Sequence, residues 1–397
     1  MTDFLTKANE LFDYTQSLRR DFHMHPELGF EEVRTAGIVA KELRELGLET
    51  TTGIAETGVV ALLEGKKPGP VLLLRFDMDA LPIEEETGAD YASTIPGKMH
   101  ACGHDGHVAI GLTVARMLHE IRDSLAGTVK FVFQPAEEGV VNDAERGGAA
   151  QMIHEGVLEN PHVDWALALH LWNSKPLGWI GVGGGPMMAG AEYFKITVVG
   201  KGGHGAMPQA SIDPIVAASE IVSALQSVVA RNVDPLRPAV LTVASIKGGE
   251  AFNVIPPKVE MTGTIRTFEP EVRQIVLTRF KEVVTGIAKA MGCEVSVSTK
   301  RITPALINTP EVAARVKTAA EAVFPSTPID EQIYLTMGAE DMAFMMAEVP
   351  SCYFFVGSAN EEKGLNYDHH HPKFDFDEAA LPRAAALMAA AAAEILK

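Results

Sequence analysis

Three apolar runs in the first half of the chain alternate with helical patterns, and this alternation restricts the possible folds most strongly. The runs cover residues 71–76, 129–133 and 165–169, with helical patterns between them at 108–122 and 149–155. Nearly continuous apolar runs of this length are typical of strands that are buried on both faces of a parallel sheet. The first part of the chain therefore predicts an α/β domain with a mostly parallel sheet, covered by helices on both faces.

A different order of elements follows in residues 187–299. Alternating strand patterns and two helical patterns succeed one another as β-α-β-β-α-β, which is the order of a ferredoxin-like unit. After residue 300 the first pattern of helices and apolar strands returns. The sequence therefore predicts a discontinuous catalytic domain of residues 1–186 and 300–397, interrupted by a smaller α+β lid or dimerisation domain of residues 187–299.

Composition excludes several classes of partner. The 397 residues suffice for two or three domains and carry a net charge of −18, which would repel a nucleic-acid backbone or an anionic membrane surface. No apolar run reaches the roughly 18 residues of a membrane span. The three cysteines are odd in number and far apart in sequence, so we expect no disulfide framework and a cytoplasmic location.

The segment from Met99 to His107 concentrates groups that bind metals. It contains three histidines, one cysteine and one aspartate, and Cys102 and His104 are two residues apart. Imidazole, thiolate and carboxylate are the ligands that transition metals prefer in proteins. A chance cluster on a polar turn is the alternative for this segment taken alone.

Two further loops at predicted strand ends carry metal-binding groups. Glu137 and Glu138 follow the apolar run 129–133, and His170 ends the run 165–169. Because sites in open α/β sheets lie at the carboxyl ends of the strands, these groups could converge with Cys102 and His104. One glutamate of such a pair can bind a metal while its neighbour takes a proton from metal-bound water. An isolated Glu-Glu pair, however, most often lies on a solvated face.

Other polar residues are candidates for metal or substrate binding. The run His369–His371 is either a solvated loop or the source of one more metal ligand. His204 lies in a glycine-rich loop that lacks the signature of a nucleotide site, and Asn253 supplies an amide. Arg266 could bind a substrate carboxylate through two hydrogen bonds or form a structural ion pair.

Taken together, nine segments resemble one known family. In chain order they read DFHMHPELGFEE, RFDMDALP, MHACGHDGH, FQPAEEG, ALHLW, GKGGHGAMP, AFNVIPPKVEMTGTIRTF, MGAED and HHHPKF. They are similar to the metallo-amidohydrolases that include hippurate hydrolases, bacterial aminoacylases and auxin-conjugate (IAA-amino acid) hydrolases, within the aminoacylase/carboxypeptidase superfamily. The resemblance covers nearly the whole chain.

The resemblance implies two divalent metal ions per subunit, for which zinc, manganese, cobalt and nickel are the candidates. The implied ligands are Cys102, His104, Glu138, His170 and His370. Within the run 369–371 we select His370, since the family pattern places the ligand two residues before the proline.

The resemblance also implies the remaining roles. Glu137 is the expected general base, and Asp79 is expected to orient a metal ligand. More distant carboxypeptidase-like relatives have a His-x-Asp pair where this chain has Asp77-x-Asp79. His204, Asn253 and Arg266 are the expected substrate-binding set, and the inserted domain is expected to form a homodimer or tetramer.

These inferences lead to one main prediction and two alternatives. The main prediction is a two-metal amidohydrolase that cleaves the amide bond of N-acyl-L-amino acids, such as hippurate-like or N-acetyl compounds. The attacking metal-bound water is activated by Glu137. The alternatives are a dipeptidase or carboxypeptidase with the same mechanism, and a non-catalytic metal-binding protein on the same scaffold.

Overall fold

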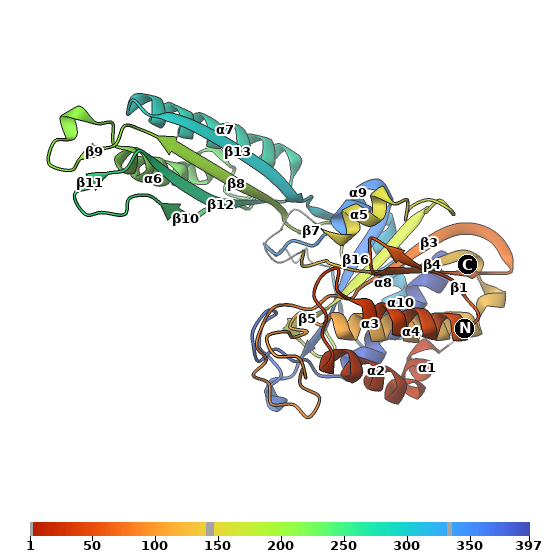
Figure 1. Ribbon diagram of the computed structural model, residues 1–397. Helices are drawn as coiled ribbons and strands as arrows, with labels where there is room; N and C mark the ends of the chain where they lie inside the picture. The colour runs from red at the N-terminus through yellow and green to blue at the C-terminus, as the bar shows by residue number, and fades with distance from the viewer. Residues whose placement is uncertain (1–2, 140–146, 332–335) are drawn as a thin grey trace. The chain divides into compact units, whose positions relative to one another are not determined.

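A computed structural model of the protein describes residues 3–139, 147–331 and 336–397 (Figure 1). These residues form two compact units. The first comprises the described residues of Met1–Gly185, Ile307–Tyr334 and Asp341–Lys397, and the second those of Pro186–Leu306 and Leu335–Glu340.

The first unit is built on an eight-stranded sheet of described residues. Four neighbouring strands run parallel, with Leu73 of β3 paired to Lys130 of β4 and Ala166 of β5, and Leu167 of β5 paired to Cys352 of β16. The order across the sheet is β1 (Glu49–Ile54), β2 (Gly58–Glu64), β4 (Ala126–Gln134), β3 (Lys67–Asp77), β5 (Trp165–Pro176), β16 (Ser351–Ala359), β6 (Ile180–Gly181) and β15 (Ile329–Asp330).

Helices cover both faces of this sheet because its central strands are apolar on both sides. On one face, Leu72, Leu74 and Leu167 join a single core with the helices α3 (Val33–Glu45), α4 (His104–Glu120), α8 (Pro310–Val323) and α10 (Ala380–Ile395). The helices α1 (Phe4–Glu10) and α2 (Phe12–Met24) pack outside α4 and α10, and α5 (Gly148–His154) and α9 (Ala343–Glu348) cover the opposite face (Figure 1).

The second unit has a four-stranded antiparallel sheet, with two helices on one of its faces. Strand β8 alternates between buried and exposed residues, and its buried Phe194 and Ile196 contact the two helices. Asp213 caps the first helix, whose first residue is Pro214. The sheet order is β10 (Ala239–Lys247), β12 (Lys258–Thr267), β8 (Gly190–Val199) and β13 (Glu294–Thr303), and the helices are α6 (Pro214–Asn232) and α7 (Pro270–Ala290).

The predicted fold class is confirmed in both units: a large, mostly parallel sheet between helices, and a separate β-α-β-β-α-β unit. The second unit and the predicted domain of residues 187–299 overlap without coinciding. Strand β13 continues beyond residue 299 to Thr303, which is still paired with Ala191 of β8, and residues 336–340 also belong to this unit.

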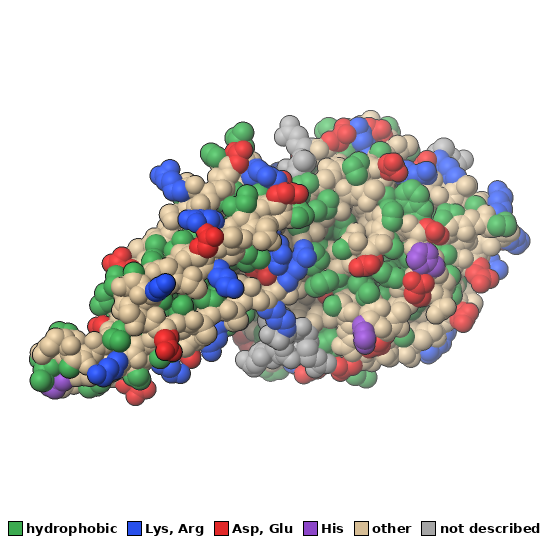
Figure 2. Space-filling model, turned by 90° about the horizontal axis from the view of Figure 1, so that it is seen from above, with side chains coloured by type: hydrophobic (Ala, Val, Ile, Leu, Met, Phe, Trp, Pro, Cys, Tyr) green, Lys and Arg blue, Asp and Glu red, His purple; other side chains and the backbone are tan. Residues whose placement is uncertain are grey.

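Two features of the described residues bear on membranes and charged partners: helix length and the charges on the face seen in Figure 2. Within residues 3–139, 147–331 and 336–397, no helix combines the length and apolarity that crossing a bilayer requires. Figure 2 shows basic and acidic side chains interspersed among apolar ones on the visible face.

Candidate metal centre

The potential ligands converge because neighbouring parallel strands end at the same edge of the first unit's sheet. Strand β3 leads to Asp77, β4 to Glu137 and Glu138, and β5 carries His170. A loop brings Cys102 to the same edge, and α4 begins directly after it. Gly103 makes this turn with φ of 91°, a left-handed conformation that favours glycine.

All five predicted ligands belong to overlapping donor sets. In each set the potential ligand atoms lie within 4.8 Å of one another, and Cys102, His104 and Glu138 each belong to more than one set. Shared donors between adjacent sets suit two neighbouring ions. Three of the sets contain the predicted ligands between them: Cys102 with His104 and His170; Cys102 with Glu138 and His370; and His104 with Glu137 and Glu138.

His104 directs one ring nitrogen into this cluster. Its Nδ1 donates to the carbonyl oxygen of Asp79 at 3.0 Å, so Nε2 is the nitrogen that carries the lone pair when the ring is neutral. Nε2 is buried and has no hydrogen-bond partner among the described residues. Burial disfavours the charged imidazole, but the carboxylates of Asp77 and Asp79 outweigh it and raise the pKa of His104 to about 10. The surrounding carboxylates therefore favour a positive charge at this position. A divalent ion bound to the neutral imidazole would supply that charge in place of a proton.

His170 and Cys102 face each other. His170 Nδ1 donates to the carbonyl oxygen of Leu171 at 2.6 Å, and Nε2 lies 3.4 Å from the sulfur of Cys102. Burial holds the pKa of His170 well below its usual value, so its imidazole is neutral, as a metal ligand must be. Burial and the charge of Glu138 hold the pKa of the Cys102 thiol well above its usual value. A bound cation would reverse that preference, since it deprotonates a coordinating thiol.

Of the three late histidines, His370 is the one beside Glu138. Its Nε2 lies 2.9 Å from Oε1 of Glu138, an oxygen that has no aligned hydrogen-bond donor among the described residues. The backbone of His370 is left-handed, with φ of 67°, and its N–H donates to the carbonyl oxygen of Ala101 at 2.8 Å. This turn brings His370 next to the loop that carries Cys102.

The other two late histidines have different contacts. His369 Nε2 donates to the carbonyl oxygen of Leu171 at 3.0 Å, and its ring packs against Trp172. His371 accepts a hydrogen bond from the N–H of Lys373 and stacks on Tyr367. Neither belongs to a donor set of described residues.

Glu137 belongs to two of the donor sets, whereas Asp79 is in none of the sets of described residues. Oε1 of Glu137 accepts from the N–H of Asp341 at 3.3 Å, and its Oε2 lies 4.0 Å from Nε2 of His104. Asp79 accepts the N–H of Glu138 at 2.9 Å, and its Oδ1 lies 3.2 Å from Nδ1 of His104. Asp79 thus contacts two potential ligands without entering the cluster itself.

Asp77 and His107 lie next to the cluster and are hydrogen-bonded to each other. His107 Nδ1 donates to Asp77 at 2.6 Å, and its Nε2 accepts the N–H of Leu171 at 3.0 Å. Although Asp77, His104 and His107 form a further potential donor set, both nitrogens of His107 are already engaged. This geometry favours an orienting role for His107.

Sequence reasoning did not identify Arg75 as part of the site. Its buried guanidinium donates to Asp77 at 2.5 Å, to Asp341 at 3.0 Å and to Gln134 at 2.9 Å. It thereby joins the ends of β3 and β4 to the segment that contacts Glu137. The signal that could have identified it is an arginine in the middle of an otherwise apolar strand.

The predicted substrate-binding residues lie in the second unit, at opposite ends of its sheet. His204 in β9 (Gly203–His204) pairs with Val254 in β11 (Val254–Ile255), and Asn253 is adjacent; both His204 and Asn253 are exposed. Arg266 pairs with Ala191, whereas the end near His204 is marked by the pair Lys258 and Val199. Eight residues of strand separate these two pairs, about 26 Å at the usual rise. The unit therefore does not bring His204 and Arg266 together.

Arg266 has the features of an anion-binding residue. Its side chain is partly buried, and its Nη1 is buried without a hydrogen-bond partner among the described residues. Burial lowers its pKa, with no carboxylate offsetting the effect.

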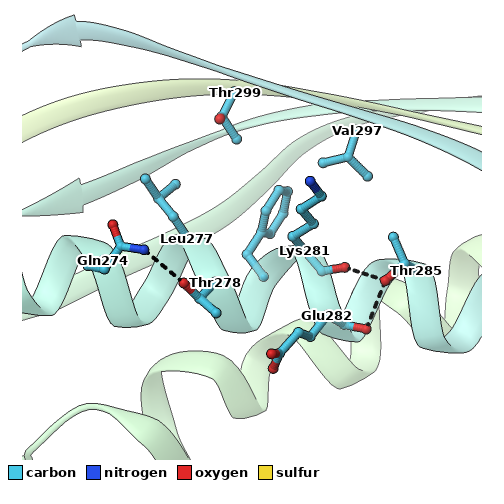
Figure 3. Close-up of a pocket in the computed structure, with 9 residues that line it drawn as sticks. Gln274, Leu277, Thr278, Lys281, Glu282, Thr285, Val297 and Thr299 are labelled. Atoms are coloured by element: carbon cyan, nitrogen blue, oxygen red, sulfur yellow. Dashed lines mark hydrogen bonds between the residues drawn. The ribbon is translucent and has the colours of Figure 1, made fainter.

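The second unit also has a surface pocket, which is lined by residues of α7 and β13. Figure 3 shows it between α7 and β13, with Leu277 and Val297 among its apolar lining and with Lys281 and Glu282 from the helix. It contains none of the predicted site residues.

Comparisons with known proteins agree with the geometry of the first unit. Residues 73–394 match the sequence profile described as peptidase family M20/M25/M40. YhaA of Bacillus subtilis, which is named as an amidohydrolase, is 42% identical over 382 residues, covering 96% of this chain and 94% of YhaA.

Two other relatives are named by their activity. An N-acetyl-L-cysteine deacetylase of Bacillus subtilis is 39% identical over 379 residues, covering 96% of this chain and 87% of the deacetylase. Thermostable carboxypeptidase 1 of Saccharolobus solfataricus is 39% identical over 377 residues, covering 94% of this chain and 93% of the carboxypeptidase.

A solved structure extends the similarity to the fold. The YXEP protein of Bacillus subtilis, described as a dinuclear metal-binding peptidase of the M20 family, matches with a TM-score of 0.84 at 35% identity, covering 98% of this chain and 99% of that chain. These similarities confirm the predicted family resemblance and the predicted class of enzyme, a metal-dependent hydrolase. Together with the donor sets, they support divalent metal ions as cofactors.

Proposed function

Because the chain belongs to peptidase family M20/M25/M40, we propose that it is a two-metal amidohydrolase that removes the acyl group from N-acyl-L-amino acids. The observation that carries this proposal is the pair of donor sets that share Cys102, with Glu137 at their side. A 39% identical relative named as an N-acetyl-L-cysteine deacetylase supports this class of substrate.

The donor set fits divalent transition metals. Cys102, His104, Glu138, His170 and His370 would hold the two ions. Nε2 of buried His104 has no hydrogen-bond partner among the described residues, and this observation points most directly to a metal ligand. Mixed sulfur, nitrogen and oxygen donors suit zinc, manganese, cobalt or nickel. When bound, such ions would polarise the scissile carbonyl and make the attacking water more acidic.

Glu137 is proposed to move the proton. Its carboxylate takes a proton from the water that attacks the amide carbon, and it returns that proton to the amine nitrogen as the C–N bond breaks. The products are a carboxylic acid and a free amino acid, and Glu137 is regenerated as a carboxylate. The N–H of Asp341 holds one oxygen of Glu137 at 3.3 Å, which leaves the other directed toward His104.

Arg266 is proposed to bind the carboxylate of the substrate. Its partly buried guanidinium has a nitrogen without a partner among the described residues, so a carboxylate would satisfy a hydrogen bond that is otherwise unmade. His204 and Asn253 are proposed to contact the scissile carbonyl and the amide.

The distance within the second unit supports a homodimer. A small substrate cannot span the roughly 26 Å between the strand end near His204 and the one that carries Arg266, so the two residues would act on one substrate only if they come from different chains. Mixing His204→Ala with Arg266→Ala protein, each impaired alone at substrate concentrations below the wild-type KM, should therefore restore part of the activity. No recovery in mixtures, or a monomer by light scattering, would remove this proposal.

The proposed function is tested with a substrate panel. Protein stripped by a chelator and reloaded with each candidate metal is assayed on hippurate, N-acetyl amino acids and dipeptides. Metal-dependent hydrolysis of the N-acyl compounds is expected, and Glu137→Gln should keep its metals and lose at least about 100-fold in kcat. Preferential cleavage of dipeptides would favour the dipeptidase or carboxypeptidase alternative. Metal binding without any hydrolysis would favour a metal-binding protein.

A further inference from the structure

Glu32 is a buried carboxyl group that the proposed mechanism does not use. It precedes α3, its side chain is fully buried, and no lysine or arginine pairs with it among the described residues. Burial and the nearby charge of Asp79 raise its pKa to about 7. A buried carboxyl group without a neighbouring cation lowers the free energy of unfolding at neutral pH. Any role that offsets this cost should be visible in the contacts of Glu32.

The contacts of Glu32 lead to the loop that carries the general base. One oxygen, Oε1, accepts the N–H of Ala136 at 2.9 Å. The other, Oε2, accepts the hydroxyl of Thr57 at 2.6 Å. Ala136 directly precedes Glu137, so Glu32 holds the Pro135–Ala136 peptide, one residue before the base.

Ala136 needs this contact because of its conformation. Its φ is 49°, in the left-handed region that residues other than glycine rarely adopt. Ala136 is fully buried, and its N–H has to be hydrogen-bonded. A left-handed residue turns the chain sharply, so the direction of the next side chain depends on whether this turn is held.

The rest of the loop is held by other groups. The N–H of Glu138 donates to Asp79 at 2.9 Å, and Oε1 of Glu137 accepts the N–H of Asp341 at 3.3 Å. Glu32 is thus a side-chain contact on the amino-terminal side of Glu137, where the carbonyl oxygen of Ala136 also accepts the N–H groups of Gly148 at 3.0 Å and Gly139 at 3.3 Å. The metal-ligating Glu138 has its own contact with Asp79.

We propose that Glu32 is a positioning residue for the general base: it holds the left-handed Ala136 and thereby aims Glu137 at the attacking water. This proposal rests on the proposed function of Glu137. The mechanism requires reach and hydrogen-bond acceptance from residue 32, and it does not require negative charge there.

Three variants separate these requirements. Glu32→Gln keeps the reach and an acceptor oxygen for Ala136 but removes the charge. Glu32→Asp keeps the charge but is one CH₂ shorter, so it cannot contact Ala136 and Thr57 together. Thr57→Val is the matched control, because it removes the hydrogen bond to the other oxygen of the same carboxyl group.

The measurements are kcat and KM, metal content, and hydrogen exchange of the peptide that contains the Ala136 amide. Glu32→Asp should lower kcat about 10- to 100-fold with KM within about twofold, the range expected for a displaced catalytic group. It should keep two metals and exchange the Ala136 amide faster. Glu32→Gln and Thr57→Val should both stay within about threefold of wild-type kcat.

Several outcomes overturn the proposal. If Glu32→Gln loses as much kcat as Glu32→Asp, charge is what matters; if Glu32→Asp keeps wild-type kcat, reach is unimportant. An equal loss in Thr57→Val would reveal general destabilisation. If instead Glu137→Gln remains active, the proposed function itself fails, and this result is independent of the variants of residue 32.

Discussion

Replacing Arg19 with methionine should weaken both the first unit and its metal centre. Arg19 is fully buried in α2 and donates to Asp105 at 2.8 Å, to Asp375 at 2.6 Å and to Glu378 at 3.3 Å. Asp105 directly follows the potential ligand His104, and Asp375 follows His370 by five residues. One guanidinium therefore connects two segments, far apart in sequence, that supply ligands.

The size of the effect follows from what remains after the substitution. Removing one partner of a buried ion pair costs about 3–5 kcal/mol, because the other charge stays buried. Here each carboxylate keeps at least one other partner. Asp105 keeps His23 at 2.8 Å, Asp375 keeps Tyr91 at 2.7 Å, and Glu378 keeps Arg20 at 2.6 Å. We therefore expect a loss near the lower end, about 3 kcal/mol. Arg19→Lys keeps the charge with fewer hydrogen bonds and should lose about 1–2 kcal/mol.

Tryptophan fluorescence during urea unfolding measures this loss in the relevant unit. All three tryptophans, Trp165, Trp172 and Trp179, belong to the first unit. Metal-free protein gives the free energy of unfolding, and a competing chelator gives metal affinity, which should also fall in Arg19→Met. A loss below about 1 kcal/mol, or a methionine variant as stable as the lysine variant, would refute the reasoning.

Three further predictions concern binding, metal and pH. Arg266→Ala should raise KM about 10- to 100-fold for substrates with a free carboxylate, the equivalent of one charge-assisted hydrogen bond, and steady-state kinetics on matched amides should show no such rise. Cys102→Ser should weaken metal affinity at least about tenfold in chelator competition and make activity less sensitive to peroxide. Burial and Arg19 lower the pKa of His23, but Asp105 and Glu85 outweigh them and raise it from 6.5 to about 8. Protonated His23 thus stabilises the fold fully below pH 6.5, and about 2 kcal/mol is lost as pH rises through 8; urea titrations of His23→Gln should lack this loss.

The architecture could be predicted because the relevant signals are local. Apolar runs such as 71–76 indicate strands buried on both faces, and they lie in the central parallel strands. The extension of β13 from residue 299 to Thr303 was not predicted, because polar residues there still pair with β8. Pairing of a polar edge strand depends on its neighbour and leaves little pattern in its own sequence.

The candidate site could be predicted in its residue types but not in its supporting contacts. Imidazole, thiolate and carboxylate groups at strand ends indicated the cluster. The contact between Arg75 and Asp341, however, joins residues 266 positions apart, and that between Glu32 and Ala136 joins residues 104 apart. Such contacts depend on the folded topology, which no local pattern encodes. The assignment of individual ligands stays a prediction.

Activity as a function of bound metal tests the central claim most directly. Metal-free protein is titrated with one candidate ion, and hydrolysis of an N-acyl amino acid is measured at each metal-to-chain ratio, with Glu137→Gln titrated in parallel. We expect activity to reach a plateau near two ions per chain, and we expect Glu137→Gln to bind the same two ions without comparable turnover. Full activity without metal, or a wild-type rate in Glu137→Gln, would contradict the account.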